Sequence, residues 1–280
     1  MRILLLSVVA LTCIVIGHAE KNDEKNIWNT HYRNVFVEDT ARSVVIYEHV
    51  EKDVKLNQQD THQEMLSIGD KITTYGGYAN YQVDSLYSSP YYETIKQMSP
   101  QESIELSRKY KTVKDCLTIN PEEGTLAYYG KIFINPYRYF EPIPEIDWVL
   151  TDETEEIMGY ECHKATAKWR GREWNAWYSD IPVNAGPWKF QGLPGLILKV
   201  EDTGGVHSIC AIAIRNIEYP IGHPYRAHCK TTREKYNEAR EDYAETAGEV
   251  IARSGLVTAV NGEKPKAHKR RLFYAPIELE

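Results

Sequence analysis

A series of short strand-like segments between residues 126 and 217 constrains the fold most. These segments are rich in β-branched and aromatic residues, and glycine-containing links such as Gly159-Tyr160 and Arg170-Gly171-Arg172 separate them. Glycine removes the cost of positive φ in tight hairpin links, so we expect consecutive segments to pair as antiparallel neighbours. The strands are expected at residues 126–129, 131–134, 147–157, 162–169, 173–179 and 196–201.

Segments outside this region complete the predicted architecture. Residues 43–50 are typical of a strand, and residues 65–75 of a hairpin that turns at Gly69-Asp70. A helix is expected at 100–110 with Ser99 as its N-cap, and a longer one at 231–253, where apolar residues recur at helical spacing. The last residues, 272–277, are expected to dock as an edge strand. The fold class is therefore mainly β (α+β): a curved antiparallel sheet or half-open barrel with a long C-terminal helix.

The aromatic composition agrees with a sheet that has half-wet surfaces. The chain has 20 Tyr and 6 Trp but only 5 Phe, and Tyr and Trp favour strands where one end of the ring is apolar and the other forms hydrogen bonds. No Gly/Ser-rich linker divides the chain, so we expect one domain over residues 20–280 with a loose segment near 261–271.

The first 19 residues have the order of a cleavable signal peptide. Arg2 precedes an apolar run over residues 3–16, and Gly17 and Ala19 occupy the small-residue positions of a cleavage site. We therefore expect export, to the periplasm or to the outer membrane as a peripheral protein, and no membrane span after cleavage. The net charge of −7 argues against nucleic-acid binding. In an oxidising compartment four cysteines are disulfide candidates, with the pairing left open: Cys116, Cys162, Cys210 and Cys229.

The stretch from Gly186 to Leu198 contains the unusual run Gly-Leu-Pro-Gly-Leu-Ile and resembles the signature of the GLPGLI family of exported proteins. The resemblance extends over further blocks at residues 157–165, 170–172, 176–183 and 275–280. It implies an envelope component of a Gram-negative lineage, and the family has no assigned biochemical role. Genes of this kind often lie near those for outer-membrane transport receptors, which makes such a receptor or another envelope protein the expected partner.

The same stretch has a direct physical interpretation. Pro187 and Pro194 fix φ while the glycines permit tight backbone, so we expect a rigid irregular loop that Trp188 and Phe190 pin to the core. Such a loop serves either as a recognition surface or as a structural corner. The candidates for binding a ligand or partner are Trp188, Phe190, Leu193, Pro194, Trp177 and Arg172.

Two chemical alternatives remain open. A zinc or copper site would draw on His207, His223, His228 and Cys229, although their spacing matches no standard zinc pattern. A hydrolase would need a buried carboxylate or histidine with a shifted pKa in a cleft, because the sequence has neither a Gly-x-Ser-x-Gly elbow nor a His-Glu-x-x-His pair. No catalytic residue is assigned. No cofactor is predicted apart from the metal ion of the first alternative. The leading expectation is an exported non-catalytic protein that binds a ligand or partner.

Overall fold

The computed structural model describes residues 27–29, 34–88, 97–99, 101–102, 105, 109–110, 115–225, 227–254 and 271–280. The expected signal peptide at residues 1–19 lies outside these residues, as does the loose segment apart from Arg271. Among the described residues, no helix is both long and apolar enough to cross a membrane.

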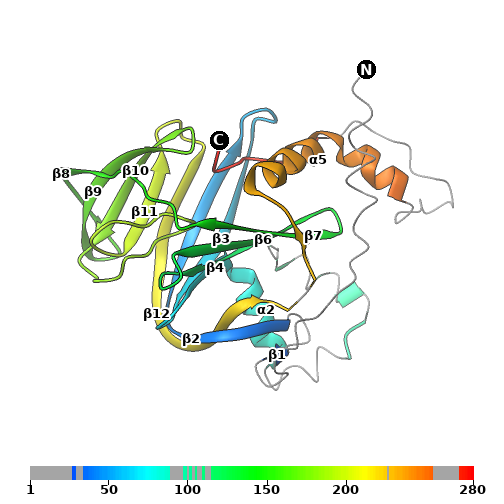
Figure 1. Cartoon of the computed structure of the whole chain (residues 1–280), viewed down its shortest axis with the longest axis horizontal. Coiled ribbons are helices and arrows are strands. Elements are labelled where there is room, and N and C mark those ends of the chain that lie inside the picture. The colour runs from blue at the N-terminus through cyan, green and yellow to red at the C-terminus, as the bar shows by residue number, and fades with distance from the viewer. Residues whose placement is uncertain are drawn as a thin grey trace.

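Thirteen strands form one strongly curved sheet, which Figure 1 shows together with its two described helices. The strands follow the order β13-β7-β6-β5-β4-β3-β2-β12-β11-β10-β9-β8, and β1 pairs with β2. All neighbours are antiparallel except β13 and β7. The strands are β1 (Ile27–Asn29), β2 (Asn34–Asp53), β3 (Gln58–Ile68), β4 (Thr73–Gly77), β5 (Cys116–Asn120), β6 (Thr125–Ile132), β7 (Asn135–Pro142), β8 (Val149–Ile157), β9 (Tyr160–Trp169), β10 (Arg172–Ser179), β11 (Ile197–Asp202), β12 (His207–Pro224) and β13 (Cys229–Lys230).

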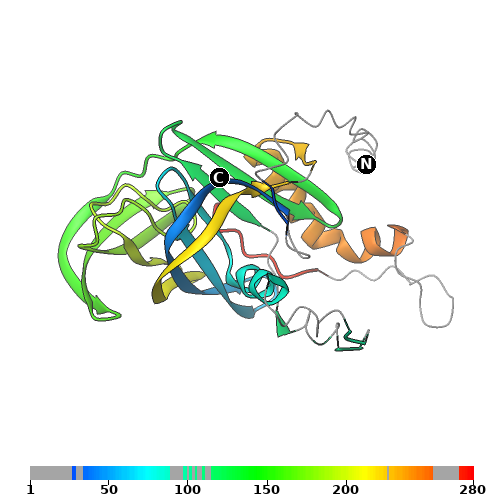
Figure 2. The ribbon, with the colours of Figure 1, turned by 90° about the horizontal axis from the view of Figure 1, so that it is seen from below.

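This architecture confirms the predicted mainly β fold with a curved antiparallel sheet and a C-terminal helix. Within the described chain, the two ends of the strand order do not pair, so the sheet is not closed into a barrel. The curvature is strongest at the end that carries β8 and β9 (Figure 2).

Tight two-residue links join β8 to β9 and β9 to β10. Met158 and Gly159 both have positive φ, of 54° and 81°, and so do Arg170 and Gly171, at 50° and 74°. Two consecutive positive φ values match the twist of antiparallel strands, which explains why glycine occupies the second position of each link. These two hairpin predictions are confirmed.

The expected pairing of residues 126–129 with residues 131–134 across Gly130 is wrong. Strand β6 runs through this residue, and the chain reverses after Ile132 instead. Glycine at position 130 lets two tyrosine side chains lie close to the strand. A Cβ there would collide with the hydroxyl of Tyr236 and lie 2.7 Å from the ring of Tyr128. Glycine inside a strand often marks such an approach.

Helix α5 (Arg233–Ser254) lies against the β6–β7 part of the sheet. Thr232 caps its first turn, since the hydroxyl of Thr232 accepts a hydrogen bond from the backbone N–H of Lys235. Tyr236 is buried among three tyrosines of β6 and β7: Tyr128, Tyr137 and Tyr139. The shorter helix α2 (Tyr78–Ser88) packs on β3 and β4.

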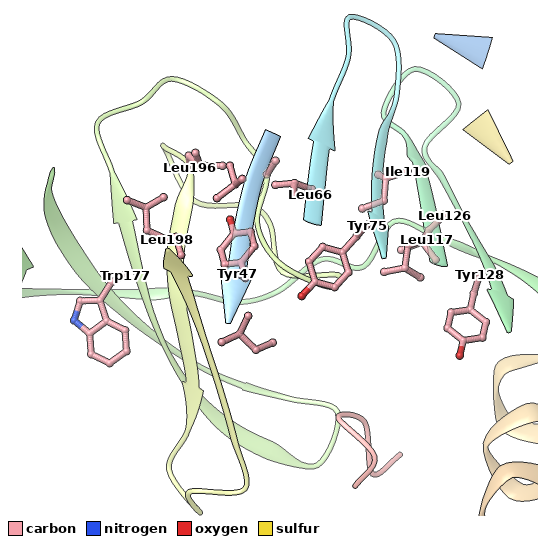
Figure 3. Close-up of a cluster of buried hydrophobic side chains, with 14 of the residues drawn as sticks. Tyr47, Leu66, Tyr75, Leu117, Ile119, Leu126, Tyr128, Trp177, Leu196 and Leu198 are labelled. Carbon is pink, nitrogen blue, oxygen red and sulfur yellow. The ribbon is translucent and has the colours of Figure 1, made fainter. Parts of the chain in front are cut away.

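One face of the central strands β12, β2 and β3 is buried against the rest of the molecule, and we call it the inner face. Residues two apart on a strand share a face, so Tyr47 and Val45 of β2 lie beside Leu66 of β3 in a single apolar cluster. Figure 3 shows Tyr47, Leu66 and Tyr75 on successive strands of this cluster. The hydroxyl of buried Tyr47 donates to the backbone oxygen of Ile197 at 2.7 Å.

The last ten residues, Arg271–Glu280, form what we call the C-terminal segment. The segment docks beside α5 and the sheet without becoming an edge strand, which corrects the prediction. Its backbone is held largely by side chains: Asp53 accepts from the Tyr274 N–H at 2.9 Å, and Arg172 donates to the carbonyls of Pro276 and Ile277 at 2.8 and 3.0 Å. Side chains rather than strand pairing therefore dock this segment.

Candidate functional site

Five ionisable side chains gather on the inner face where β12, β2 and β3 run side by side. We call His49, Glu51, His62, Glu64 and His207 the His–Glu cluster. The strand register produces it: His49 lies opposite His62, and Glu51 lies between Asp60 and His207. Alternation along β2 continues the apolar series of Val45 and Tyr47 into His49 and Glu51, so this face changes from apolar to polar.

The cluster is connected by short polar contacts. His49 Nδ1 lies 3.1 Å from Glu64 Oε2, and His49 Nε2 lies 3.1 Å from His207 Nδ1. His207 Nε2 contacts the carbonyl oxygen of Pro276 at 3.2 Å. The hydroxyl of Tyr75 donates to the same oxygen of Glu64 that faces His49. These contacts tie the sheet to the C-terminal segment.

The contacts also fix where protons lie. A carbonyl oxygen only accepts, so His207 Nε2 carries a proton, and Nδ1 of the neutral ring accepts from His49 Nε2. His49 then presents Nδ1 to Glu64 Oε2, which is an acceptor too. The space between Nδ1 and Oε2 therefore requires a positive charge, supplied by a proton or by a metal ion.

Burial and the neighbouring charges shift the pKa values of the cluster. Burial alone would raise the pKa of Glu64, but His49 and His62 outweigh it and hold that pKa well below its usual value. Burial, together with His49 and Arg172, lowers the pKa of His207 to about 3, so the ring is neutral at pH 7. Burial raises the pKa of Glu51. Contacts with Glu64 raise that of His62 against the effect of burial.

Three overlapping sets of these side chains have ligand atoms within 4.8 Å of one another. Imidazole nitrogens and carboxylate oxygens are common ligands of first-row transition metals, so the cluster has suitable donor chemistry. Among the described residues the sets are His49–His62–Glu64, His49–Glu51–His207 and Glu51–Asp60–His62.

A cavity of about 250 Å³ adjoins the cluster, between the sheet, α5 and the C-terminal segment. Its walls combine aromatic rings with carboxylates. The aromatic residues are Tyr75, Tyr128, Tyr139, Trp188, Tyr236, Phe273 and Tyr274. Among the described lining residues, the carboxylates are Glu51, Asp60, Glu64, Asp115 and Glu278, and the basic side chains are Arg240, His49 and His62. The described lining thus has more carboxylates than basic side chains.

A second group of charges, the buried ion cluster, joins the Gly-Pro-rich loop to the C-terminal segment. The ammonium of Lys189, which is fully buried, lies 2.5 Å from Glu141 and 2.7 Å from Glu278. Arg233 and Arg170 also pair with both carboxylates. The buried ion cluster consists of Lys189, Arg170, Arg233, Glu141 and Glu278. Because Glu278 belongs to the C-terminal segment, the cluster fixes one wall of the cavity.

The structure separates the loop residues that were candidates for recognition. Phe190 and Leu193 are buried in the core, where Phe190 packs on Trp174 with ring centroids 4.7 Å apart. Pro194 is exposed. Trp188 lines the cavity, and its indole N–H donates to Glu278 at 3.0 Å. The φ of Trp188 is 54°, an uncommon value outside glycine.

The other two candidates lie apart from Trp188. Trp177 is on the opposite face of β10 from Trp174, three residues before it, because successive strand residues alternate between faces. The ammonium of Lys199 lies 4.1 Å from the centre of the Trp177 ring. Arg172 binds the backbone of the C-terminal segment and pairs with Asp202 at 3.3 Å, so it positions the cavity wall.

The described residues place the four predicted metal ligands in two regions. His207 belongs to the His–Glu cluster. His223, which pairs with Glu38, and His228 both contact the ring of Tyr129, and Cys229 follows His228 in β13 beside β7.

No disulfide bond joins the predicted cysteines in the described part of the chain. Cys162 and Cys210 carry free thiols, and burial raises the pKa of Cys162 to about 11. Cys116 lies in β5 and Cys229 in β13.

The sequence interpretation missed four of the five residues of the His–Glu cluster. A usable signal exists: His49 and Glu51 are two apart on one strand, and His62 and Glu64 are two apart on the next, so each pair shares a face. What the sequence does not show is that β2 and β3 pair with His49 opposite His62.

A protein-family model described as Protein of unknown function (Porph_ging) matches residues 170–199, which include the Gly-Leu-Pro-Gly-Leu-Ile run. No curated protein matches the chain. Two solved structures of PNGF-II, in the C2 and P21 space groups, are similar to it, each with 13% identity and a TM-score of 0.48. Each comparison covers 72% of this chain and 33% of the other, so the chain spans about a third of the length of those proteins.

Proposed function

We propose that this is a binding protein that holds a small cation in the acidic cavity beneath its C-terminal segment. The observation that carries the proposal is the excess of carboxylates in the described cavity wall, where five carboxylates face three basic side chains, Arg240, His49 and His62. Burying carboxylates is costly unless positive charge compensates them. A cationic ligand supplies that compensation.

The local pairings locate the excess of negative charge. Glu278 is compensated within the buried ion cluster, and Asp115 has Arg240 at 4.0 Å. At the His–Glu cluster, burial raises the pKa of Glu51, and the effects of Glu64 and Asp60 oppose those of His49 and His62. Three of the five carboxylates, Glu51, Asp60 and Glu64, lie at this end of the cavity, so we place the cation there.

The aromatic walls support the same ligand class. The faces of Tyr and Trp rings attract cations, most strongly where water is excluded. Tyr75, Tyr128 and Trp188 line the cavity next to the carboxylates. An anionic ligand would meet carboxylates on most sides, and a neutral apolar ligand would leave them uncompensated.

Export and an envelope partner belong to this proposal. Support comes from the order of residues in the first 19 positions and from the resemblance of the loop and the C-terminal ending to exported envelope proteins. In this role the protein would carry or retain a cation outside the cytoplasm, in contact with an outer-membrane transport receptor or another envelope protein.

The test is a comparison of small ions by thermal unfolding and calorimetry. Zn²⁺, Ca²⁺ and putrescine serve as cationic probes, and succinate as the matched dianion. Saturation at 100 times Kd adds about 2.7 kcal/mol of stability, so bound cations raise Tm. Glu51→Gln should weaken the binding of the cation about tenfold or more. Glu155→Gln should leave it unchanged, because Glu155 pairs with Lys199 on the face of the sheet opposite the inner face.

Two outcomes contradict the proposal. The first is that succinate raises Tm as much as the cations do. The second is that Glu51→Gln and Glu155→Gln have the same effect on the binding of every cation.

A further inference from the structure

The part of the His–Glu cluster that lies on β2 and β3 contains three potential metal ligands. Two imidazoles and one carboxylate, from His49, His62 and Glu64, converge there with ligand atoms within 4.8 Å of one another. His49 Nδ1 lies 3.1 Å from Glu64 Oε2, and His62 Nε2 lies 3.7 Å from Glu64 Oε1. Ligands about 2.1 Å from a tetrahedral zinc are about 3.4 Å apart, so these separations are close to those of a bound metal.

The hydrogen-bond chain is compatible with a metal ion at this point. The carbonyl of Pro276 fixes the proton on His207 Nε2, and the chain through His207 Nδ1 fixes the proton on His49 Nε2. This arrangement leaves His49 Nδ1 facing a carboxylate oxygen that already accepts from Tyr75. A proton on His49 Nδ1 fills this position when no metal is bound, and a metal ion that replaced the proton would be ligated by both atoms.

The surroundings of His49 and Glu64 match those of metal ligands. A ligating histidine generally donates its other ring nitrogen to a carboxylate, carbonyl or similar acceptor. His49 is oriented by His207, and His62 Nδ1 lies 3.9 Å from Glu51. Glu64 is oriented by the hydroxyl of Tyr75.

We propose that His49, His62 and Glu64 bind one divalent transition-metal ion of the zinc class, with the remaining coordination position facing the acidic cavity. This inference rests on the proposed cation-binding function and names the cation. The site differs from the four ligands suggested by the sequence, since His223, His228 and Cys229 lie elsewhere. The choice of Zn²⁺ over Ca²⁺ follows from the two imidazoles, because Ca²⁺ takes oxygen ligands.

The test measures Zn²⁺ binding by calorimetry and by competition with a chromophoric chelator. The full chain should bind one equivalent of Zn²⁺ and prefer it to Ca²⁺. His62→Ala and Glu64→Gln should each weaken binding by about 100-fold or more, since loss of an outer partner alone costs 10–100-fold. His223→Ala is the matched control, because His223 also pairs with a carboxylate, Glu38, but lies outside the cluster.

A measurement on the unmutated protein keeps the test valid if a variant misfolds. The visible and near-ultraviolet spectrum of the Co²⁺-loaded chain should show nitrogen and oxygen ligation without a thiolate charge-transfer band. A thiolate band would assign the ion to a cysteine and overturn the proposal. So would equal binding by His62→Ala, Glu64→Gln and His223→Ala.

The failure of this inference can be told apart from failure of the proposed function. If Zn²⁺ does not bind but putrescine does, and Glu51→Gln weakens it, the metal site is refuted and cation binding stands. If neither probe binds, both proposals are refuted.

Discussion

In the buried ion cluster, counting charges predicts which of two substitutions lowers the free energy of unfolding more. Three cations, Lys189, Arg170 and Arg233, surround two carboxylates, Glu141 and Glu278, with all of these side chains largely buried. Glu278→Gln leaves three cations around one carboxylate. Lys189→Met leaves two cations with two carboxylates, so the charges balance.

The magnitudes follow from the behaviour of buried ion pairs. Removing one partner of a buried ion pair and leaving an uncompensated charge costs about 3–5 kcal/mol, whereas replacing a whole pair by apolar residues of similar volume is often neutral. We therefore expect Glu278→Gln to lower the free energy of unfolding by about 3–5 kcal/mol. Lys189→Met should cost less than Glu278→Gln, because Arg170 and Arg233 still pair with both carboxylates, even though Lys189 is the more deeply buried of the two mutated residues.

The assay is urea unfolding followed by circular dichroism, with the slope of the transition checked for equality between variants. Glu155→Gln serves as the control, because its exposed pair with Lys199 should contribute at most about 1 kcal/mol. A larger loss for Lys189→Met than for Glu278→Gln would refute the reasoning from charge balance.

Three further predictions concern stability. Phe190→Ala should lower the free energy of unfolding by about 3–5 kcal/mol, because the ring is 1% exposed and packs among tryptophans; a loss below 1 kcal/mol in urea would show that the loop is not part of the core. Gly130→Ala should cost about 1–3 kcal/mol, since its Cβ would meet the buried Tyr236 hydroxyl, and an unchanged urea midpoint would contradict this. Burial raises the pKa of Asp53, but the Tyr274 N–H and other donors outweigh it, so the net pKa is lowered. Its contribution is therefore complete above about pH 4 and lost as pH falls through the lowered pKa, and the stability gap between wild type and Asp53→Asn should shrink at low pH; a gap independent of pH would contradict this.

Much of the sheet could be predicted from the sequence because its signals are local. Gly159 and Gly171 mark two-residue links whose positive φ values are visible in the residue types alone. Trp174 and Trp177 lie on opposite faces of β10, as a spacing of three requires. These features depend on neighbours within a few residues.

The errors have non-local causes. Gly130 looks like a turn residue, and only the approach of Tyr236 from α5 explains why glycine lies inside β6. The C-terminal segment looks like an edge strand because its residues are apolar, yet Asp53 and Arg172 hold its backbone groups. Neither partner is near in the sequence.

The candidate site was even harder to predict from the sequence. Of the histidines proposed as metal ligands, His207 alone belongs to the His–Glu cluster, because the choice favoured residues close together along the chain, such as His223 and His228. The structure instead joins His49 to His207 across 158 positions. Only the pairing of β2 with both β3 and β12 brings these side chains together.

The central claim is that the cavity beneath the C-terminal segment holds a cation, and native mass spectrometry tests it most directly. The full-length gene would be expressed in its own host, and the protein purified from the cell envelope without chelators. We predict an excess mass that corresponds to one small cation and that is missing from the Glu51→Gln/Glu64→Gln variant. A wild-type mass equal to that of the bare chain, or the same excess mass on the variant, would contradict the claim.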